Sequence, residues 1–348
     1  MYRADEGLAF LLRYENVAWY EEGTVRILDR RIYPVRQEYV TCTSHCEVAQ
    51  AIADMVTQSG GPYVAAAMGM ALAAYEARDI ADEQQYLDYI EKAAYTLSHA
   101  RPTTAAKMEN VVKGSVDRVK EALKDGKTPA DMPEILKEKA ISNCNANYSK
   151  FDKVAAYLAD QIPQGGTIMT QCFAETIIGT LLRECRRRGN EIKMICAETR
   201  PYYQGARLTA SVGADMGFDT TVITDNMPAY TMKEKKVDLF TSAADVITMD
   251  GHVINKVGTF QIALAARYWG IPYFATGTPN PKHPDLSSVQ IELRDPNQVL
   301  GSLEAGKHTL SGVKGFYPAF DITPPKLVDG IVTDKGILSP YTLHGYFD

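Results

Sequence analysis

The chain of 348 residues has neither a long hydrophobic run nor an excess of basic residues. No segment approaches the roughly 20 apolar residues that span a bilayer, and the N-terminus lacks the apolar stretch of a secretion signal. The 37 Lys and Arg residues against 43 Asp and Glu residues give a net charge of -6. Nucleic acid and membrane are therefore not expected as partners, and we expect a cytoplasmic protein.

Phosphate-binding loops of the common nucleotide-binding kinds are also missing. No G-x-G-x-x-G pattern follows the first strand of the second half, and Gly165-Gly166 comes before that strand instead. A G-x-x-x-x-G-K-[ST] loop is absent as well. A dinucleotide cofactor is weakly supported, an ATP-dependent kinase is disfavoured, and we expect no cofactor.

Cysteine is sparse, with six residues and no C-x-x-C spacing. Cys42 and Cys46 flank His45 and are the one close pair, but no matching histidine pair completes a zinc site. Reduced thiols fit better than disulfides, and no metal site is expected.

The first half of the chain has a helical pattern that follows two short strands. A length of 348 residues predicts two domains. Residues 17–20 and 24–29 alternate like two strands joined by a tight turn. Apolar spacing of three to four predicts helices at 47–56, 63–75, 82–97 and 105–123. Residues 124–133 carry turn formers, so we expect residues 1–133 to form a helical domain with a small antiparallel sheet.

The second half, residues 134–348, alternates β-rich runs with amphipathic helices. A helix at about 151–161 should lead into it. Expected strands are 167–170, 193–196, 220–223, 238–241, 246–248 and 272–275. Expected helices between them include 173–188, 204–216 and 259–269. This alternation predicts an α/β fold with a doubly wound parallel sheet, in which ligands lie beyond the carboxyl ends of the strands.

Polar side chains gather at two strand-to-helix junctions of this half. The run from Ala197 to Ala210 contains Glu198, Arg200, Gln204 and Arg207, and the sequence Thr224-Asp225-Asn226-Met227 follows the next strand. Charged and amide groups at strand ends typically hold a small polar ligand. Asp225 and Asn226 are equally compatible with a turn and a helix cap.

An ordered series of motifs across nearly the whole chain resembles the 5-methylthioribose-1-phosphate isomerase family. The motifs are Gly60-Gly61-Pro62, Arg101-Pro102-Thr103, Thr170-Gln171-Cys172, Glu198-Thr199-Arg200-Pro201, Gln204-Gly205-Ala206-Arg207, Thr224-Asp225-Asn226, Ala244-Asp245 and Asn255-Lys256-Val257-Gly258-Thr259. The same superfamily includes ribose-1,5-bisphosphate isomerases and regulatory subunits of a translation-initiation exchange factor. The resemblance implies a Rossmann-like C-terminal domain, a homodimer and a role in methionine salvage.

The resemblance assigns catalysis to Cys172 and Asp245. A cysteine after a strand is more often a buried apolar residue, and here the motif series reverses that expectation. Phosphate on the anomeric oxygen prevents spontaneous ring opening, so Asp245 would donate to the ring oxygen while Cys172 serves as base or acid at C2. Hydrogen could move as a proton or as a hydride. We expect a raised pKa for the carboxyl, and a pKa of the thiol lowered by a positive neighbour.

The resemblance also implies the substrate contacts. They are Ser59, Gly60, Gly61, Arg101 and Gln204 for phosphate, and Asn255 and Lys256 for sugar hydroxyls. Arg200 and Arg207 are expected to support the loop through Glu198. The family has an arginine where this chain has Ser59, so a phosphate-facing cation is missing, with Arg101 and Lys107 as candidates to replace it.

Two alternatives follow from that departure. The first is a related isomerase of unphosphorylated methylthioribose or of another pentose, such as deoxyribose 1-phosphate or ribose 1,5-bisphosphate. The second is a non-catalytic regulatory subunit that senses a sugar phosphate, which has no need to keep both a thiol and a carboxyl.

Overall fold

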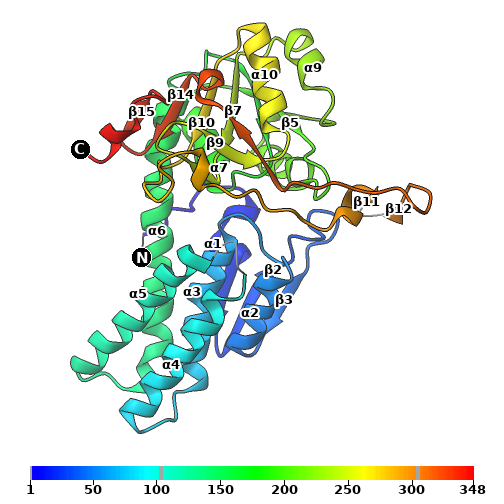
Figure 1. Cartoon of the computed structure of the whole chain (residues 1–348). Helices are drawn as coiled ribbons and strands as arrows, with labels where there is room; N and C mark the ends of the chain where they lie inside the picture. Colours follow the sequence, from blue (N-terminus) through cyan, green and yellow to red (C-terminus); the bar gives the residue numbers. More distant parts are fainter. Residues whose placement is uncertain (1, 102–104, 303–305) are drawn as a thin grey trace. The chain divides into compact units, whose positions relative to one another are not determined.

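The computed structural model describes residues 2–101, 105–302 and 306–348. The chain forms two compact units, Met1–Ser149 and Lys150–Asp348 (Figure 1).

The first unit opens with a three-stranded antiparallel sheet. Strand β1 (Ala18–Glu21) pairs with β2 (Thr24–Leu28) across a two-residue turn, and β2 pairs with β3 (Tyr39–Cys42). Gly23 has a φ of 80°, which is the left-handed conformation that such a hairpin turn requires. The expected two-stranded hairpin is confirmed, and β3 is an addition to it.

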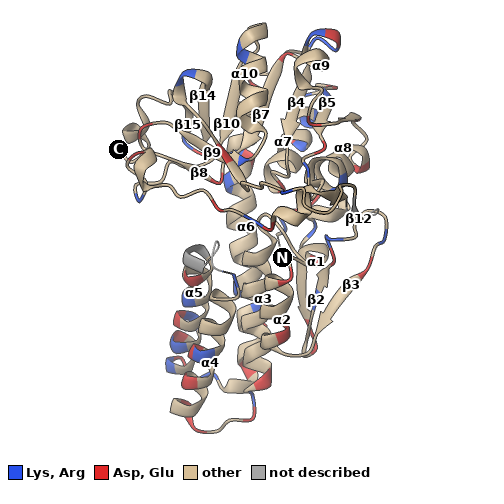
Figure 2. Cartoon of the chain, turned by 45° about the vertical axis from the view of Figure 1, so that its right-hand side comes forward, with Lys and Arg blue, Asp and Glu red and all other residues tan. Residues whose placement is uncertain are grey.

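Helices make up the rest of this unit. After a short helix α1 (Tyr14–Val17) they are α2 (His45–Ala53), α3 (Gly61–Glu76), α4 (Glu83–Ser98) and α5 (Ala105–Lys124). Ser44 and Asp82 cap α2 and α4 by accepting backbone N–H groups. Figure 2 shows both signs of charge along α4 and α5. Helix α3 is apolar on nearly all sides and is largely buried, so it forms the centre of the unit.

Helix α6 (Met132–Ala159) is much longer than the expected helix at 151–161. It begins at the end of the expected loop, after a 3-10 turn (Pro129–Asp131) that Thr128 and Asp131 cap reciprocally. Residues 134–149, which were expected in the second domain, belong to the first unit.

A seven-stranded sheet organises the second unit. Its strands are β4 (Thr167–Gln171), β5 (Lys193–Ala197), β6 (Asp219–Ile223), β7 (Leu239–Ala243), β10 (Tyr273–Thr276), β14 (Gly330–Thr333) and β15 (Gly336–Leu338). The order is β15-β14-β10-β7-β4-β5-β6, and only the edge pair β14 and β15 is antiparallel. The connecting helices include α7 (Thr176–Arg187), α8 (Ala210–Asp215), α9 (Pro228–Glu234) and α10 (Thr259–Trp269). The doubly wound α/β fold is thereby confirmed.

One expected strand of that sheet belongs elsewhere. Strand β8 (Val246–Ile247) pairs antiparallel with β9 (Val253–Lys256), which in turn pairs with β13 (Phe320–Thr323). The chain reverses between β8 and β9 through Gly251, whose φ is 90°. The apolar run at 246–248 gives no sign of this reversal, so its placement in the parallel sheet was wrong.

Candidate functional site

The site begins where the strand order of the large sheet reverses. From β4 the chain proceeds outward to β5 and β6, and then returns to β7 on the other side of β4. Loops at such a switch point diverge and leave room for a ligand at the carboxyl ends of the strands. Cys172 follows β4 directly, and Asp245 lies two residues after β7. The topology therefore brings the two expected catalytic residues to neighbouring strand ends.

The backbone of Cys172 is held in an unusual conformation. Its φ is 63°, in the left-handed region that non-glycine residues rarely adopt, and Thr199 has a φ of 65°. The Cys172 N–H donates to Thr199 Oγ1 at 2.9 Å, and the Thr209 hydroxyl donates to the Cys172 carbonyl. Such strain persists only where surrounding contacts enforce it, and here two threonines of one loop do so.

That loop is the polar run at 198–210, which ends in a single π-helical turn, Gly205–Thr209. Asp225 accepts the backbone N–H groups of Thr199 at 2.8 Å and Arg200 at 2.7 Å, so it anchors the loop. Arg200 donates to the Gly301 carbonyl, and Arg207 to the Tyr202 carbonyl at 2.7 Å. Both arginines thus support the loop by donating hydrogen bonds to backbone carbonyl groups. The expected support through Glu198 stays a prediction.

Hydrogen bonds also connect β4 to the Asn255-Lys256 segment. Gln171 Nε2 donates to the Val257 carbonyl at 2.9 Å, and Gln171 Oε1 lies 2.7 Å from Thr259 Oγ1. Asn255 Nδ2 donates to the same Thr259 oxygen at 3.0 Å. Because Gln171 precedes Cys172, this network fixes the position of the Asn255-Lys256 segment relative to the thiol.

The electrostatics of the thiol differ from the expectation. Burial raises the pKa of Cys172 to about 11, and Lys256 and Arg294 only partly offset this. Burial also lowers the pKa of Lys256, against the attraction of Cys172 and Asp245. The expectation of a thiol pKa lowered by a positive neighbour was wrong, because desolvation outweighs the two cations. At neutral pH the thiol is therefore protonated.

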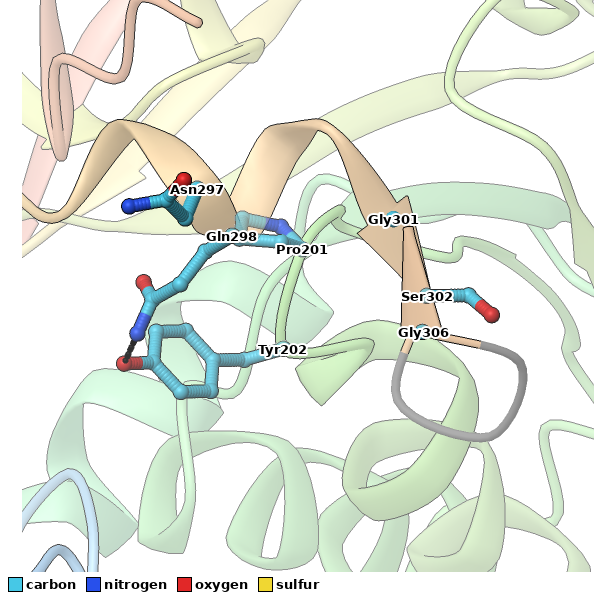
Figure 3. A pocket seen from close by; sticks show the side chains of 7 residues that line it. All are labelled: Pro201, Tyr202, Asn297, Gln298, Gly301, Ser302 and Gly306. Carbon is cyan, nitrogen blue, oxygen red and sulfur yellow. Dashed lines mark hydrogen bonds between the residues drawn. The ribbon is translucent and has the colours of Figure 1, made fainter. Parts of the chain in front are cut away.

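Gln204, an expected substrate contact, is only 6% exposed, and its Oε1 has no hydrogen-bond partner among the described residues. A buried amide oxygen without a partner is costly, which fits a group that a ligand satisfies. Tyr202, two residues earlier, lines a cavity of about 300 Å³. Figure 3 shows Gln298 reaching across this cavity, where its Nε2 donates to the Tyr202 hydroxyl at 2.8 Å.

The remaining expected contacts, Ser59, Gly60, Gly61 and Arg101, belong to the first unit. Gly60 and Gly61 open helix α3, and Ser59 just before them has a φ of 59°. Helix N-termini favour anions through the partial positive charge of the helix dipole, although in α3 the Gly61 N–H already donates to the Gln58 carbonyl at 3.1 Å. That these four residues share a site with Cys172 stays a prediction. Lys107, a candidate cation, lies in a part of α5 whose side chains are outside the described residues.

Several relevant residues gave no signal in the sequence. Arg30, which is fully buried, donates from Nη1 to the Gln58 carbonyl at 2.7 Å, just before Ser59. Arg294 and Tyr317 lie within electrostatic reach of Cys172. Arg294 is more than a hundred positions from Cys172 in the sequence, so no spacing rule relates the two.

The described residues contain no candidate metal centre. No group of three or more His, Cys, Asp or Glu side chains there is arranged to hold a metal ion. All six cysteines are free thiols. No helix in the described ranges combines the length and apolar character needed to cross a membrane.

Fold and site together define the class of protein. The sequence model of the initiation factor 2 subunit family matches residues 57–340, and the chain belongs to that family. Within it, the methylthioribose-1-phosphate isomerase of Thermosipho africanus (strain TCF52B) is 34% identical over 327 residues, which are 90% of this chain and 92% of the relative. The enzyme of the same name from Heliobacterium modesticaldum (strain ATCC 51547 / Ice1) is 34% identical over 343 residues, which are 94% and 96% of the two chains.

Solved structures give the same grouping. The crystal structure of 5-methylthioribose 1-phosphate isomerase from Pyrococcus horikoshii OT3 matches with a TM-score of 0.83 at 27% identity, over 95% of this chain and 94% of that chain. Translation initiation factor eIF-2B, subunit delta, from A. fulgidus matches with a TM-score of 0.81 at 28% identity, over 93% and 96%. The resemblance read from the motifs is confirmed.

Proposed function

We propose that this chain is an aldose-ketose isomerase that converts 5-methylthioribose 1-phosphate to the corresponding ribulose 1-phosphate, a step of methionine salvage. The observation that carries the proposal is the joint presence of Cys172 and Asp245 at the switch point of the sheet. They occur in a chain that is 34% identical to a methylthioribose-1-phosphate isomerase over 90% of its length.

The chemistry divides between the two groups. Asp245 protonates the ring oxygen, which opens a ring whose anomeric oxygen is blocked by phosphate. Cys172 acts as base or acid at C2, whose hydrogen must reach C1 to turn the aldose into a ketose. The Cys172 thiol is protonated near neutrality, while burial makes the Lys256 ammonium more acidic. Both shifts have desolvation as their largest cause, and each favours the uncharged form of its group.

Phosphate binding is assigned to the N-terminus of α3 at Ser59, Gly60 and Gly61, with Arg101 and Gln204. The partial positive charge at a helix start and the paired donors of a guanidinium both favour a phosphate. The buried Arg30, which holds the carbonyl of Gln58, adds positive charge next to this loop. The Arg30 charge replaces part of the positive charge that is missing because serine stands at position 59, where the family has an arginine. Asn255 and Lys256 would hold sugar hydroxyls.

The direct test measures ketose formation by purified protein from methylthioribose 1-phosphate. Cys172→Ala and Asp245→Asn are expected to lower kcat by at least about a thousandfold, as removal of an essential acid or base does. Cys185→Ala is the matched control, because Cys185 is a free thiol whose pKa is also raised to about 11, but it is buried within α7. Full activity of either site variant would contradict the assignment.

The substrate alternatives are separated by competition in the same assay. Unphosphorylated methylthioribose, deoxyribose 1-phosphate and ribose 1,5-bisphosphate are each offered beside methylthioribose 1-phosphate, and kcat/KM is compared. A preference for the unphosphorylated sugar would mean that Ser59 marks a real loss of phosphate recognition.

A regulatory, non-catalytic role is the second candidate, and the match to translation initiation factor eIF-2B, subunit delta, is the observation that favours it. Binding of the sugar phosphate by calorimetry with no turnover would establish this role in place of the enzyme. The retained thiol and carboxyl support the enzyme, because sensing alone requires neither.

A homodimer and a cytoplasmic location are further parts of the proposal. Helix α10 exposes Phe260, Leu264 and Tyr268 at a spacing of four residues, and Tyr230 on the contacting helix α9 is 73% exposed. Figure 1 shows the two helices side by side. A stripe of exposed apolar side chains is typical of a subunit interface. Sedimentation of the wild type against Leu264→Glu tests it, with a monomeric wild type as the contrary result.

A further inference from the structure

Tyr317 has a hydroxyl group that the fold of the second unit leaves without a partner. The side chain is 3% exposed, and its oxygen has no hydrogen-bond partner in the described ranges. Leaving a buried hydroxyl unbonded costs roughly 1–3 kcal/mol. Each such group in a native structure calls for an explanation, and a role in catalysis is one.

The backbone around Tyr317 is firmly placed. The Arg294 N–H donates to the Tyr317 carbonyl at 3.0 Å, and the Ala319 N–H donates to the Glu292 carbonyl at 2.9 Å. Leu293 and Pro318 form an antiparallel bridge between these two bonds. Strand β13 begins directly afterwards, with Phe320 opposite Lys256 of β9. This pairing connects Tyr317 to the strand that carries the Lys256 ammonium.

Two cations lie around the same aromatic ring. Lys256 Nζ is 4.5 Å from the centroid of the Phe320 ring, and Arg294 Cζ is 5.7 Å from it. Arg294 is also 5.9 Å from the centroid of the Tyr202 ring. Both cations and the Tyr317 hydroxyl lie within electrostatic reach of the Cys172 thiol. The surroundings of the thiol are therefore suited to a negative charge that develops during a reaction.

Arg294 is a charged neighbour of the Tyr317 hydroxyl and restricts how that hydroxyl can bond. A guanidinium only donates, so Arg294 can face the lone pairs of the hydroxyl but cannot accept its hydrogen. Burial raises the pKa of Tyr317 to about 12, with Arg294 acting in the opposite direction, so the phenol keeps its proton at neutral pH. Tyr317 is thus a donor that needs an acceptor beside Cys172.

We propose that the Tyr317 phenol donates a hydrogen bond to the sugar oxygen that changes from hydroxyl to carbonyl during isomerisation, which makes Tyr317 a third catalytic residue beside Cys172 and Asp245. This assignment rests on the proposed isomerase function. Arg294 acts as a positioning residue, which keeps the phenol oriented while its own guanidinium bonds to Glu292 at 2.8 Å. A donor that meets charge as it develops lowers the barrier more than it strengthens ground-state binding, so its loss should appear in kcat.

The test compares Tyr317→Phe with a matched control, Tyr86→Phe. Tyr86 is fully buried in α4, and its hydroxyl likewise has no partner among the described residues. Both variants should keep or raise the Tm of the wild type, because each removes an unsatisfied polar group. Only Tyr317→Phe should lower kcat, by roughly a hundredfold with KM within about threefold, as for loss of a donor to a developing oxyanion.

The contrary results are distinct. A Tyr317→Phe variant with unchanged kcat overturns the assignment, and so does a lower Tm with a loss confined to KM, since either indicates a structural or simple binding role. A wild type that forms no ketose overturns the isomerase function and the assignment with it. An active wild type with an equally active Tyr317→Phe variant overturns this assignment alone.

Discussion

Two polar loops of the molecule, residues 57–61 before α3 and residues 198–210 after β5, each contain a glycine where any larger residue would collide with a neighbouring atom. The kind of neighbour differs between the two loops. A Cβ added to Gly61 would lie 1.8 Å from Thr57 Oγ1, and a Cβ added to Gly205 would lie 1.8 Å from the Ala197 carbonyl oxygen. The first obstacle is the hydroxyl of the buried Thr57 side chain, whereas the second is the backbone of an interior strand. The first loop is therefore adjustable, and the second is fixed because it also holds the backbone of Cys172.

The largest expected effect tests that contrast directly. Gly205→Ala should lower the free energy of unfolding by at least about 3 kcal/mol, because the backbone of β5 would have to move. Gly61→Ala should lower it by only about 1 kcal/mol, since the Thr57 hydroxyl can turn away. Urea denaturation measures both. Gly114→Ala in α5, where an added Cβ meets no atom within 4 Å, serves as the control. Equal losses at Gly61 and Gly205 would remove the distinction.

A second change examines what supports the adjustable loop. Arg30→Met should reduce the free energy of unfolding by about 2 kcal/mol, because it leaves the Gln58 carbonyl without a charged donor. Arg36→Met is the control, because Arg36 is 62% exposed and pairs with Glu38, itself 56% exposed, at the surface. In the isomerase assay, Arg30→Met should also raise KM. A stable Arg30→Met protein with unchanged KM would show that the loop does not depend on this cation.

A third change loosens the fixed loop without introducing a clash. Thr199→Val removes the oxygen that accepts the Cys172 N–H, and we expect a loss of about 1 kcal/mol of unfolding free energy. Activity should fall with it, because Cys172 would no longer be held at its positive φ. Thr199→Ser keeps the hydroxyl and should behave like the wild type in both measurements. If valine and serine variants were indistinguishable, the hydrogen bond would have no role in positioning.

The smallest effect concerns reactivity. With a pKa of about 11, Cys172 has far less than 1% thiolate at pH 8, and the fraction rises about tenfold for each pH unit up to the pKa. Alkylation by iodoacetamide, followed by peptide mass spectrometry between pH 7 and 10, should therefore show a continuous rise for Cys172. The exposed Cys46 provides an internal reference in the same sample. An alkylation rate at Cys172 that levels off below pH 8 would mean that Lys256 and Arg294 lower the pKa of the thiol more than burial raises it.

Much of the fold could be predicted from local patterns. The hairpin at Ala18–Leu28, four helices of the first unit and five of the parallel strands appear at their expected positions, because period and turn chemistry are local properties. Strands β14 and β15 and the first half of α6 were missed although they are local elements. Other missed elements depend on distant contacts. Strand β9 has no clear alternation of its own and is stabilised by pairing with β13, which lies more than sixty residues away.

The site shows the same division. The sequence by itself determined the family, the chemical groups at Cys172 and Asp245, and the loop at 198–210, because these are read from residue types in a fixed order. Only the tertiary structure decided the protonation of the Cys172 thiol, the support of its backbone by Thr199 and Asp225, and the approach of Arg294 and Tyr317. The physical reason is that desolvation and hydrogen-bond satisfaction depend on which atoms surround a group, and residue order alone does not specify those atoms.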